Sequence, residues 1–288
     1  MRKTSAPQTA PGRALELHQR LPLAGLLAPV LLAGCPASVV PPALTPAPPG
    51  PSTQAVTELL RPLLDGEWVP GLAVGLIGPD GIETYGFGRV HDDDPRPPDQ
   101  RTVFEIGSVT KVFTALLLAD LAEQGELRLD QAVTDLLPFA TLAPRPDEVP
   151  ITLEDLAAHT SGLPRLPDNL NPADPAQPYA DYTAEQLESF LGGHPLSHAP
   201  DAPYEYSNLG AGLLGRILAT RDGRTYAELV AERITGPLDL PDTVVALDDG
   251  QRGRLAAPHD VDGRLVPAWE FGVLAPCGAL HSTVADLL

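Results

Sequence analysis

The sequence is poor in two residue types that decide which chemistry it can carry. It has only two cysteines in 288 residues, which excludes a disulfide-built scaffold and a structural zinc site of four thiolates. It also has only two lysines, Lys3 and Lys111, while 17 arginines supply the rest of its 19 basic residues. With 38 acidic residues the formal net charge is −19, and an acidic chain without a basic stripe is not expected to bind nucleic acid.

Motifs for metals and cofactors are also missing. The sequence has no H-E-x-x-H, no paired C-x-x-C and no G-x-S-x-G. His91 stands beside three consecutive aspartates, which cannot all face one ion, so this segment is predicted to be a solvated acidic loop. Gly210, Gly212 and Gly215 have the spacing of a dinucleotide fingerprint, but they lie within an expected helix and favour close packing. We expect neither a metal nor a cofactor.

The N-terminal 52 residues differ from the rest in charge. They carry four basic residues and one acidic residue, a net of +3, whereas the remainder carries −22. The basic start and a 14-residue apolar run, broken by Pro22 and Pro29, predict a secretory signal rather than a membrane span. The run ends in Leu-Ala-Gly-Cys35, which resembles a bacterial lipobox with a lipidated cysteine. The alternative is a signal peptide cleaved elsewhere, with Cys35 incidental.

These features divide the chain into three parts. Residues 1–35 are predicted to be a signal peptide with a lipobox. Residues 36–52 contain seven prolines in 17 positions and are predicted to form a semi-rigid tether. One lipid chain anchors weakly, so stable attachment would need more than one. We expect an exported protein, lipid-anchored in a bacterial cell envelope on the periplasmic or extracellular face.

Residues 53–288 are predicted to form a mixed α/β (α+β) domain. Two short apolar runs at 71–77 and 82–87 flank the turn residues Pro-Asp-Gly and predict a hairpin. Residues 160–182, rich in Pro, Asp and Asn, are predicted to be a loop. Apolar periodicity and capping residues predict helices at 57–64, 109–124, 132–137, 152–158, 183–191, 208–220 and 225–234. In the second of these, we expect the buried side to include Val112, Phe113, Leu116, Leu117, Ala119 and Leu121.

Ser108 and Lys111 form the most informative pair. They lie three residues apart at the start of a predicted helix, so the amine can reach the hydroxyl. A serine nucleophile needs an adjacent base, and lysine can serve because burial lowers the pKa of an amine, whereas arginine does not deprotonate. The alternative is that Ser108 is only an N-cap, worth about 1 kcal/mol, and Lys111 an exposed helix residue. Ser108 could also be both cap and nucleophile, with its own N–H stabilising an oxyanion.

Tyr206-Ser207-Asn208 forms a second candidate motif, before another predicted helix. A tyrosine beside a lysine can share its proton and act as a base. An asparagine offers one acceptor and two donor hydrogens to a substrate amide. Alone, Tyr206 would be interpreted as a half-buried structural residue, but together with Ser108 and Lys111 it favours a catalytic site.

Ser108-x-x-Lys111 followed by Tyr206-x-Asn208 resembles the penicillin-recognising serine hydrolases, specifically the β-lactamase-related group of class C β-lactamases, D,D-peptidases and family VIII-type esterases. The likeness runs from about residue 56 to the end and includes residues 159–164 and 276–287. It implies Ser108 as the acylated nucleophile, Lys111 and Tyr206 as the base system and Asn208 as a substrate contact.

The same resemblance implies the fold and the substrates. The fold would be a sandwich of an antiparallel sheet with packed helices, plus a helical subdomain around residues 110–235. The substrate would be a small molecule or peptidoglycan-type compound: a D-alanyl peptide, a β-lactam or a small ester. The resemblance implies no oligomeric state.

One family motif is absent from the sequence. No K-T-G, K-S-G or H-x-G follows Asn208, and the residues after His259 and His281 do not fit. The sequence ends at Leu288 within a helix expected from about Thr283, so we expect an incomplete domain without the C-terminal strands of the family's sheet. A non-catalytic envelope lipoprotein that binds peptidoglycan-like ligands is the alternative. Cys277 is predicted to be a small buried residue rather than a nucleophile.

Overall fold

The computed structural model describes residues 53–66, 69–137, 149–193 and 204–288. The predicted signal peptide, Cys35 and the proline-rich tether lie outside these ranges. Among the described residues, no helix has both the length and the apolar character needed to cross a membrane.

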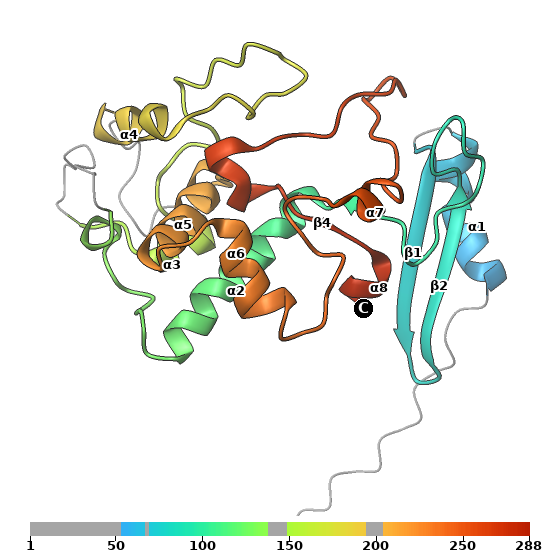
Figure 1. Ribbon diagram of the computed structural model, residues 1–288, viewed down its shortest axis with the longest axis horizontal. Coiled ribbons are helices and arrows are strands. Elements are labelled where there is room, and N and C mark those ends of the chain that lie inside the picture. The colour runs from blue at the N-terminus through green and yellow to red at the C-terminus, as the bar shows by residue number, and fades with distance from the viewer. Residues whose placement is uncertain (1–52, 67–68, 138–148, 194–203) are drawn as a thin grey trace, which may run out of the picture. The chain divides into compact units, whose positions relative to one another are not determined.

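The described chain begins with a helix and the predicted hairpin. Helix α1 spans Thr53–Asp65, and strands β1 (Gly71–Gly78) and β2 (Gly81–Gly88) pair antiparallel from Gly71↔Gly88 to Gly78↔Gly81 (Figure 1). The turn requires φ of 118° at Gly81, a value that glycine adopts without strain. The hairpin prediction is therefore confirmed, and the helix begins four residues before its predicted start at residue 57.

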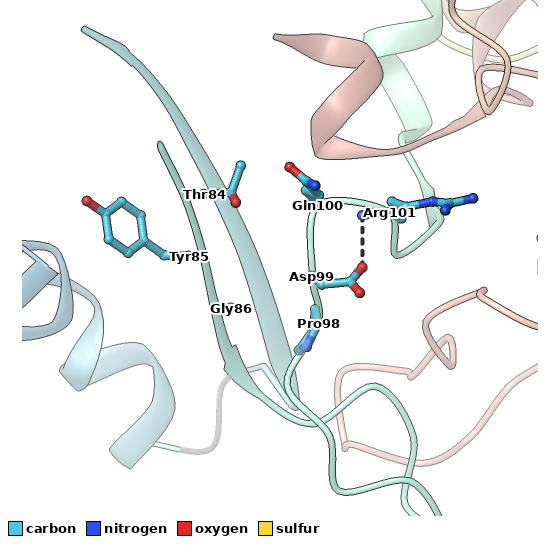
Figure 2. A pocket seen from close by; sticks show the side chains of 7 residues that line it. All are labelled: Thr84, Tyr85, Gly86, Pro98, Asp99, Gln100 and Arg101. Carbon is cyan, nitrogen blue, oxygen red and sulfur yellow. Dashed lines mark hydrogen bonds between the residues drawn. The ribbon is translucent and has the colours of Figure 1, made fainter. Parts of the chain in front are cut away.

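A loop lies directly against the hairpin. A Cβ on Gly86 would lie 1.7 Å from the carbonyl oxygen of Pro98, so only a glycine allows this approach. A pocket opens between the two segments, lined by residues 84–86 of β2 and residues 98–101 of the loop (Figure 2). None of its lining residues belongs to the predicted catalytic set.

The described residues between 110 and 235 are largely helical, as predicted. Its helices are α2 (Thr110–Glu123), α3 (Leu153–Ala158), α4 (Ala184–Gly193), α5 (Asn208–Arg221) and α6 (Tyr226–Val230), the last running into a π-helical turn at Ala231–Thr235. Thr152 caps α3 and Thr225 caps α6, each in a reciprocal capping box. The predicted helix at 132–137 is only a 3-10 turn, Val133–Asp135. Residues 160–182 contain no helix or strand.

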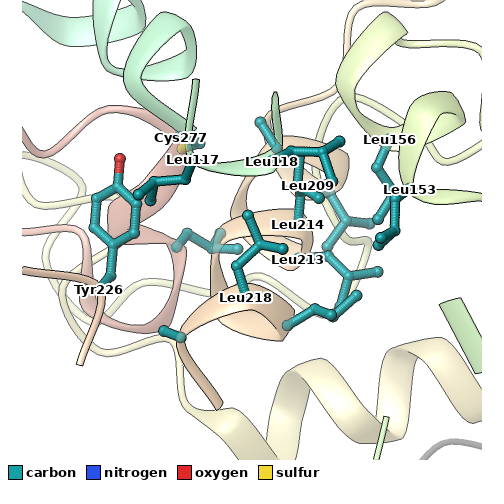
Figure 3. Close-up of a cluster of buried hydrophobic side chains, with 14 of the residues drawn as sticks. Leu117, Leu118, Leu153, Leu156, Leu209, Leu213, Leu214, Leu218, Tyr226 and Cys277 are labelled. Atoms are coloured by element: carbon teal, nitrogen blue, oxygen red, sulfur yellow. The ribbon is translucent and has the colours of Figure 1, made fainter. Parts of the chain in front are cut away.

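Helix α5 runs through the centre of the main hydrophobic core (Figure 3). Nearly all of its residues are buried, and the core is completed by Leu117 and Leu121 of α2 together with side chains of α3, α4 and α6. Its glycines make this packing possible: a Cβ on Gly212 would lie 2.7 Å from Leu274, and one on Gly215 2.2 Å from Pro276. The prediction that these glycines serve close packing is confirmed.

The buried face of α2 differs from the predicted one. Val112 and Leu116 are 57% and 45% exposed, whereas Thr110, Thr114 and Leu118 are buried. The reason is that part of this face packs on the 3-10 turn Gly272–Cys277 and the residues that follow it. There, Thr114 Oγ1 donates to Pro276 O and Thr110 Oγ1 accepts from Leu280 N.

A second antiparallel pair, which the sequence analysis did not predict, joins distant parts of the chain. Strand β3 (Phe104–Glu105) pairs with β4 (His281–Ser282), and within the described residues this pair forms a sheet separate from the hairpin. The remaining short helices are α7 (Asp249–Arg252) and α8 (Val284–Leu287), with Thr283 capping α8 near the predicted position. The mixed fold class, with antiparallel strands and packed helices, is confirmed.

Candidate active site

The turn that carries Ser108 sets the direction of its side chain. Gly107 adopts φ of 49° and opens a 3-10 turn, Gly107–Val109, that continues into α2. The N-cap of α2 is Val109, without a side-chain cap, so the interpretation of Ser108 as the N-cap is wrong. Because the 3-10 turn already provides the first turn, the Ser108 hydroxyl is exposed and available for other partners.

Two side chains meet at the Ser108 hydroxyl. Tyr206 Oη donates a hydrogen bond to Ser108 Oγ at 2.6 Å, and Lys111 Nζ donates one at 3.1 Å. The lysine ammonium also lies 4.8 Å from the centroid of the Tyr206 ring. The structure therefore brings together all three residues that the sequence analysis named as nucleophile and base system. If either Lys111 or Tyr206 loses one proton, the deprotonated group is a base within reach of the Ser108 hydroxyl.

Lys111 is held in place by a carbonyl group far away in the sequence. Its Nζ donates to Cys277 O at 2.7 Å. The Cys277 segment is fixed on α2 by two further bonds: Thr114 Oγ1 donates to Pro276 O at 2.8 Å, and Leu280 N donates to Thr110 Oγ1 at 3.1 Å. Neither threonine was predicted from the sequence, although their i, i+4 spacing beside Lys111 places them on one helix face.

Cys277 contributes its backbone rather than its thiol. Its side chain is 2% exposed, and burial raises the pKa of the Cys277 thiol to about 11 despite the opposing charge of Lys111. A thiol with this pKa remains protonated and is a poor nucleophile near neutral pH. The prediction that Cys277 is a small buried residue is confirmed.

Tyr206 lies among several polar and charged side chains. The Arg165 guanidinium carbon is 5.2 Å from its ring centroid, and the His159 ring is 4.7 Å away, centroid to centroid. Burial alone would raise the pKa of Tyr206, but interactions with Lys111 and Ser108, and the charge of Arg165, outweigh burial and lower it. The site thus stabilises the phenolate relative to that of a free tyrosine. Arg165, which lies in the predicted loop, was not predicted from the sequence to be part of the site.

His159 orders the chain that leads to Tyr206. It ends α3 with φ of 62°, and its Nδ1 accepts a hydrogen bond from Ser207 N at 3.2 Å. Its carbonyl oxygen accepts from Glu205 N at 2.9 Å. Burial, followed by the charge of Lys111, lowers the pKa of His159, which keeps the ring neutral near pH 7. These contacts agree with the structural role predicted for it.

Asn208 lies at the first position of α5, and its side chain is buried rather than open to solvent. It is 7% exposed, and its Nδ2 donates to Tyr179 Oη at 3.2 Å. Its Oδ1 is buried without a hydrogen-bond partner among the described residues. Tyr179 in turn stacks on Phe271, with centroids 5.0 Å apart. A role for Asn208 in contacting substrate stays a prediction.

The acidic loop around His91 is paired with arginines. Asp92 forms an ion pair with Arg89, and Asp94 forms one with Arg96. Among the residues that the structure describes, no group of three or more His, Cys, Asp or Glu side chains is arranged to hold a metal ion.

Comparison with known proteins identifies the family of the chain. A family model described as Beta-lactamase matches residues 56–288. The chain belongs to this family. Similar proteins include the D-alanyl-D-alanine-carboxypeptidase/endopeptidase AmpH of Escherichia coli K12, 29% identical over 223 residues that cover 77% of this chain and 57% of AmpH. A Beta-lactamase of Pseudomonas fluorescens is 27% identical over 238 residues, covering 82% of this chain and 62% of that protein.

The solved structures agree with this Beta-lactamase family assignment. A class C beta lactamase from Rhodobacter sphaeroides superimposes with a TM-score of 0.67 at 29% identity, covering 82% of this chain and 63% of that one. The chain therefore spans roughly three fifths of the length of these relatives. The Beta-lactamase fold expected from the sequence motifs is thus confirmed by family and by structure.

Proposed function

We propose that this Beta-lactamase family chain carries the nucleophile and base of a serine hydrolase that works through an acyl-enzyme on Ser108. The observation that supports it most directly is the convergence of Tyr206 Oη and Lys111 Nζ on Ser108 Oγ, at 2.6 and 3.1 Å. A purely structural serine has no need of a titratable partner, whereas a serine nucleophile needs an adjacent base.

The reaction would proceed by two acyl transfers. With one proton removed from the Lys111–Tyr206 pair, the resulting base accepts the Ser108 proton as Oγ bonds to the substrate carbonyl carbon. The tetrahedral intermediate collapses, the bond from carbonyl carbon to the leaving nitrogen or oxygen breaks, and the proton passes to that atom. Water then attacks the ester, the same base removes a water proton, and Ser108 Oγ leaves with its proton restored.

The substrate would be a D-alanyl peptide, a β-lactam or a small ester. The support comes from the names of similar proteins: one relative is named a D-alanyl-D-alanine-carboxypeptidase/endopeptidase and others are named Beta-lactamase. A small-molecule or peptidoglycan-type substrate suits all of these names. The Ser108 N–H at the helix start is our candidate for one oxyanion donor.

Covalent labelling tests the proposal. The chain is incubated with a fluorophosphonate or a fluorescent penicillin, and the adduct is located by mass spectrometry. We expect a mass gain on the peptide containing Ser108 and none in Ser108→Ala. An adduct that persists in Ser108→Ala, or none in the wild type, would contradict the nucleophile assignment and favour the non-catalytic, ligand-binding alternative.

The lysine can be tested without removing its charge. Lys111→Arg keeps a cation but loses the ability to deprotonate, so we expect labelling of Ser108 to slow by about 10²–10⁴-fold. Val112→Ala, next to Lys111 but 57% exposed, is the matched control and should label at the wild-type rate. Equal labelling in wild type and Lys111→Arg would show that Lys111 is not part of the base system.

We also propose that the protein is exported and held in a bacterial cell envelope by lipid on Cys35, with residues 36–52 as a tether. The support is the basic start, the apolar run and the Leu-Ala-Gly-Cys35 sequence. Metabolic labelling with a fatty-acid analogue should mark the full chain and should fail in Cys35→Ala. Incorporation that survives this substitution would contradict the anchor.

A further inference from the structure

Arg165 is set apart from most arginines of this acidic chain. The majority of the described arginines lie within 4.0 Å of a carboxylate, as in the pairs Arg221–Glu126 and Arg254–Asp242. The Arg165 guanidinium instead lies over the face of the Tyr206 ring, 5.2 Å from its centroid. No carboxylate of the described residues forms an ion pair with it. Its charge is therefore directed at the ring next to the nucleophile.

The backbone of Arg165 is tied to the chain that follows Tyr206. Arg165 O accepts hydrogen bonds from Asn208 N at 3.0 Å and Leu209 N at 3.2 Å. The preceding Pro164 O accepts one from Ser207 Oγ at 2.7 Å. Because these bonds join the loop to the first turn of α5, the base of the arginine side chain has a fixed position relative to Tyr206.

Among the described groups around Tyr206, Lys111 is the other source of positive charge. From α2, the Lys111 ammonium lies 4.8 Å from the ring centroid. At the end of α3, His159 is neutral because burial and the charge of Lys111 lower its pKa. Tyr179, on the loop side, has a pKa raised first by burial and stays a neutral phenol. Glu205, the preceding residue, is exposed.

We propose that Arg165 is a positioning residue that stabilises the phenolate form of Tyr206 from its ring face, and so increases the fraction of the base facing Ser108. The role of the base rests on the proposed function, whereas the effect on Tyr206 does not. A cation over an aromatic ring is attracted to the neutral ring, and the attraction increases when the ring carries a negative charge. Lys111 is shared among Ser108, Cys277 O and the ring, so a second cation adds to its effect.

The direct test is the titration of Tyr206 by nuclear magnetic resonance, with ¹³C in the ring carbon of tyrosine that bears the hydroxyl. The Tyr206 signal is assigned by its loss in Tyr206→Phe. In Arg165→Gln we expect the midpoint to rise by roughly 0.3–1 pH unit, a two- to tenfold loss of phenolate at a fixed pH. Arg165→Lys should recover part of the shift. Arg61→Gln, an exposed arginine on α1, is the matched control and should leave the midpoint unchanged.

The consequence for the reaction is read from the pH dependence of Ser108 labelling by a fluorophosphonate. In Arg165→Gln, the pH at which the labelling rate falls on the acid side should be higher than in the wild type. The increase should equal the increase in the Tyr206 titration midpoint, and the thermal unfolding temperature should be unchanged. An unshifted Tyr206 titration overturns the proposal. So does a defect seen only with carboxylate-bearing substrates and not with a neutral ester, since Arg165 would then bind the substrate's anion. If wild-type Ser108 takes no label, the proposed function fails while the titration still decides the role of Arg165.

Discussion

The helical region from α2 to α6 and the hairpin β1–β2 bury their side chains to very different extents. In α5, most positions on every side of the helix are buried. In the hairpin, no described residue is fully buried, and Ile77 and Ile82 beside the turn are 67% and 61% exposed. The main hydrophobic core takes no residue from either hairpin strand.

This difference indicates which contacts hold the candidate site. Ser108 and Lys111 lie at the start of α2, and Tyr206 lies just before α5, so the core between these helices fixes their relative positions. The hairpin meets a different partner: a Cβ on Gly75 of β1 would lie 2.5 Å from Val284 of α8. We therefore expect changes in the helical core to affect stability and the site together, and changes in the hairpin to affect neither strongly.

The largest expected contrast compares Leu213→Ala with Ile82→Ala. Leu213 is fully buried in α5, and its truncation should lower the free energy of unfolding by about 2–5 kcal/mol through lost burial and a cavity. Ile82 is 61% exposed, and its truncation should change stability by about 0.5 kcal/mol or less. Chemical denaturation measures both. Similar costs for the two variants would contradict the comparison.

A smaller contrast uses glycine, because two glycines of the helical region have opposite surroundings. A Cβ on Gly215 would lie 2.2 Å from Pro276, so Gly215→Ala should cost about 1–3 kcal/mol through overpacking. It should also slow labelling of Ser108, since Pro276 precedes the carbonyl that holds Lys111. Gly193→Ala, whose new Cβ meets no atom of another described segment within 4 Å, is the control and should be neutral or slightly stabilising. Slower labelling in Gly193→Ala would break the link between packing and the site.

The sequence was sufficient to predict the hairpin, the main helices, and Ser108 with the two side chains that meet at it. The hairpin and the helices depend on local signals, namely alternating or periodic apolar residues and turn residues. Ser108 and Lys111 were predicted from their spacing, whereas Tyr206 was predicted from its combination with that pair and from the family resemblance. The buried face of α2 was not predicted correctly, because apolar periodicity predicts that Val112, rather than Thr114, is buried. Thr114 is buried because it meets a carbonyl from residue 276, and sequence periodicity carries no information about that partner.

Two other features could not be predicted because they depend on contacts between residues far apart in the sequence. Strands β3 and β4 are two residues each and pair across more than 170 positions, too short for an alternating pattern to appear. Arg165 lies in a loop without periodicity, and only the fold brings it to Tyr206. The hydroxyl of Ser108 faces Lys111 because a 3-10 turn precedes α2, a detail that capping preferences alone do not distinguish.

The smallest expected effect compares two ion pairs and their dependence on pH. Asp242 accepts hydrogen bonds from Arg254 at 2.8 and 2.5 Å, and this pairing lowers the pKa of Asp242 despite partial burial. Asp94 is paired with Arg96 two residues away, which lowers its pKa to about 2. The pKa of Asp94 is lowered more than that of Asp242. However, Asp94 and Arg96 also stay close together in the unfolded chain, so their pairing contributes less to the free energy of unfolding.

We therefore expect Asp242→Asn to destabilise the protein by about 1 kcal/mol at pH 7, allowing for solvent screening, and Asp94→Asn to leave its stability unchanged. A carboxylate with a lowered folded pKa stabilises the fold above its unfolded pKa of about 3.9, and that stability is lost as the pH falls through the folded value. The difference between wild type and Asp242→Asn should accordingly shrink below about pH 4 in thermal unfolding curves. A difference that persists unchanged from pH 7 to pH 2 would show that the Asp242 carboxylate acts through packing rather than charge, because a charge-dependent contribution declines once the pH falls below the unfolded pKa.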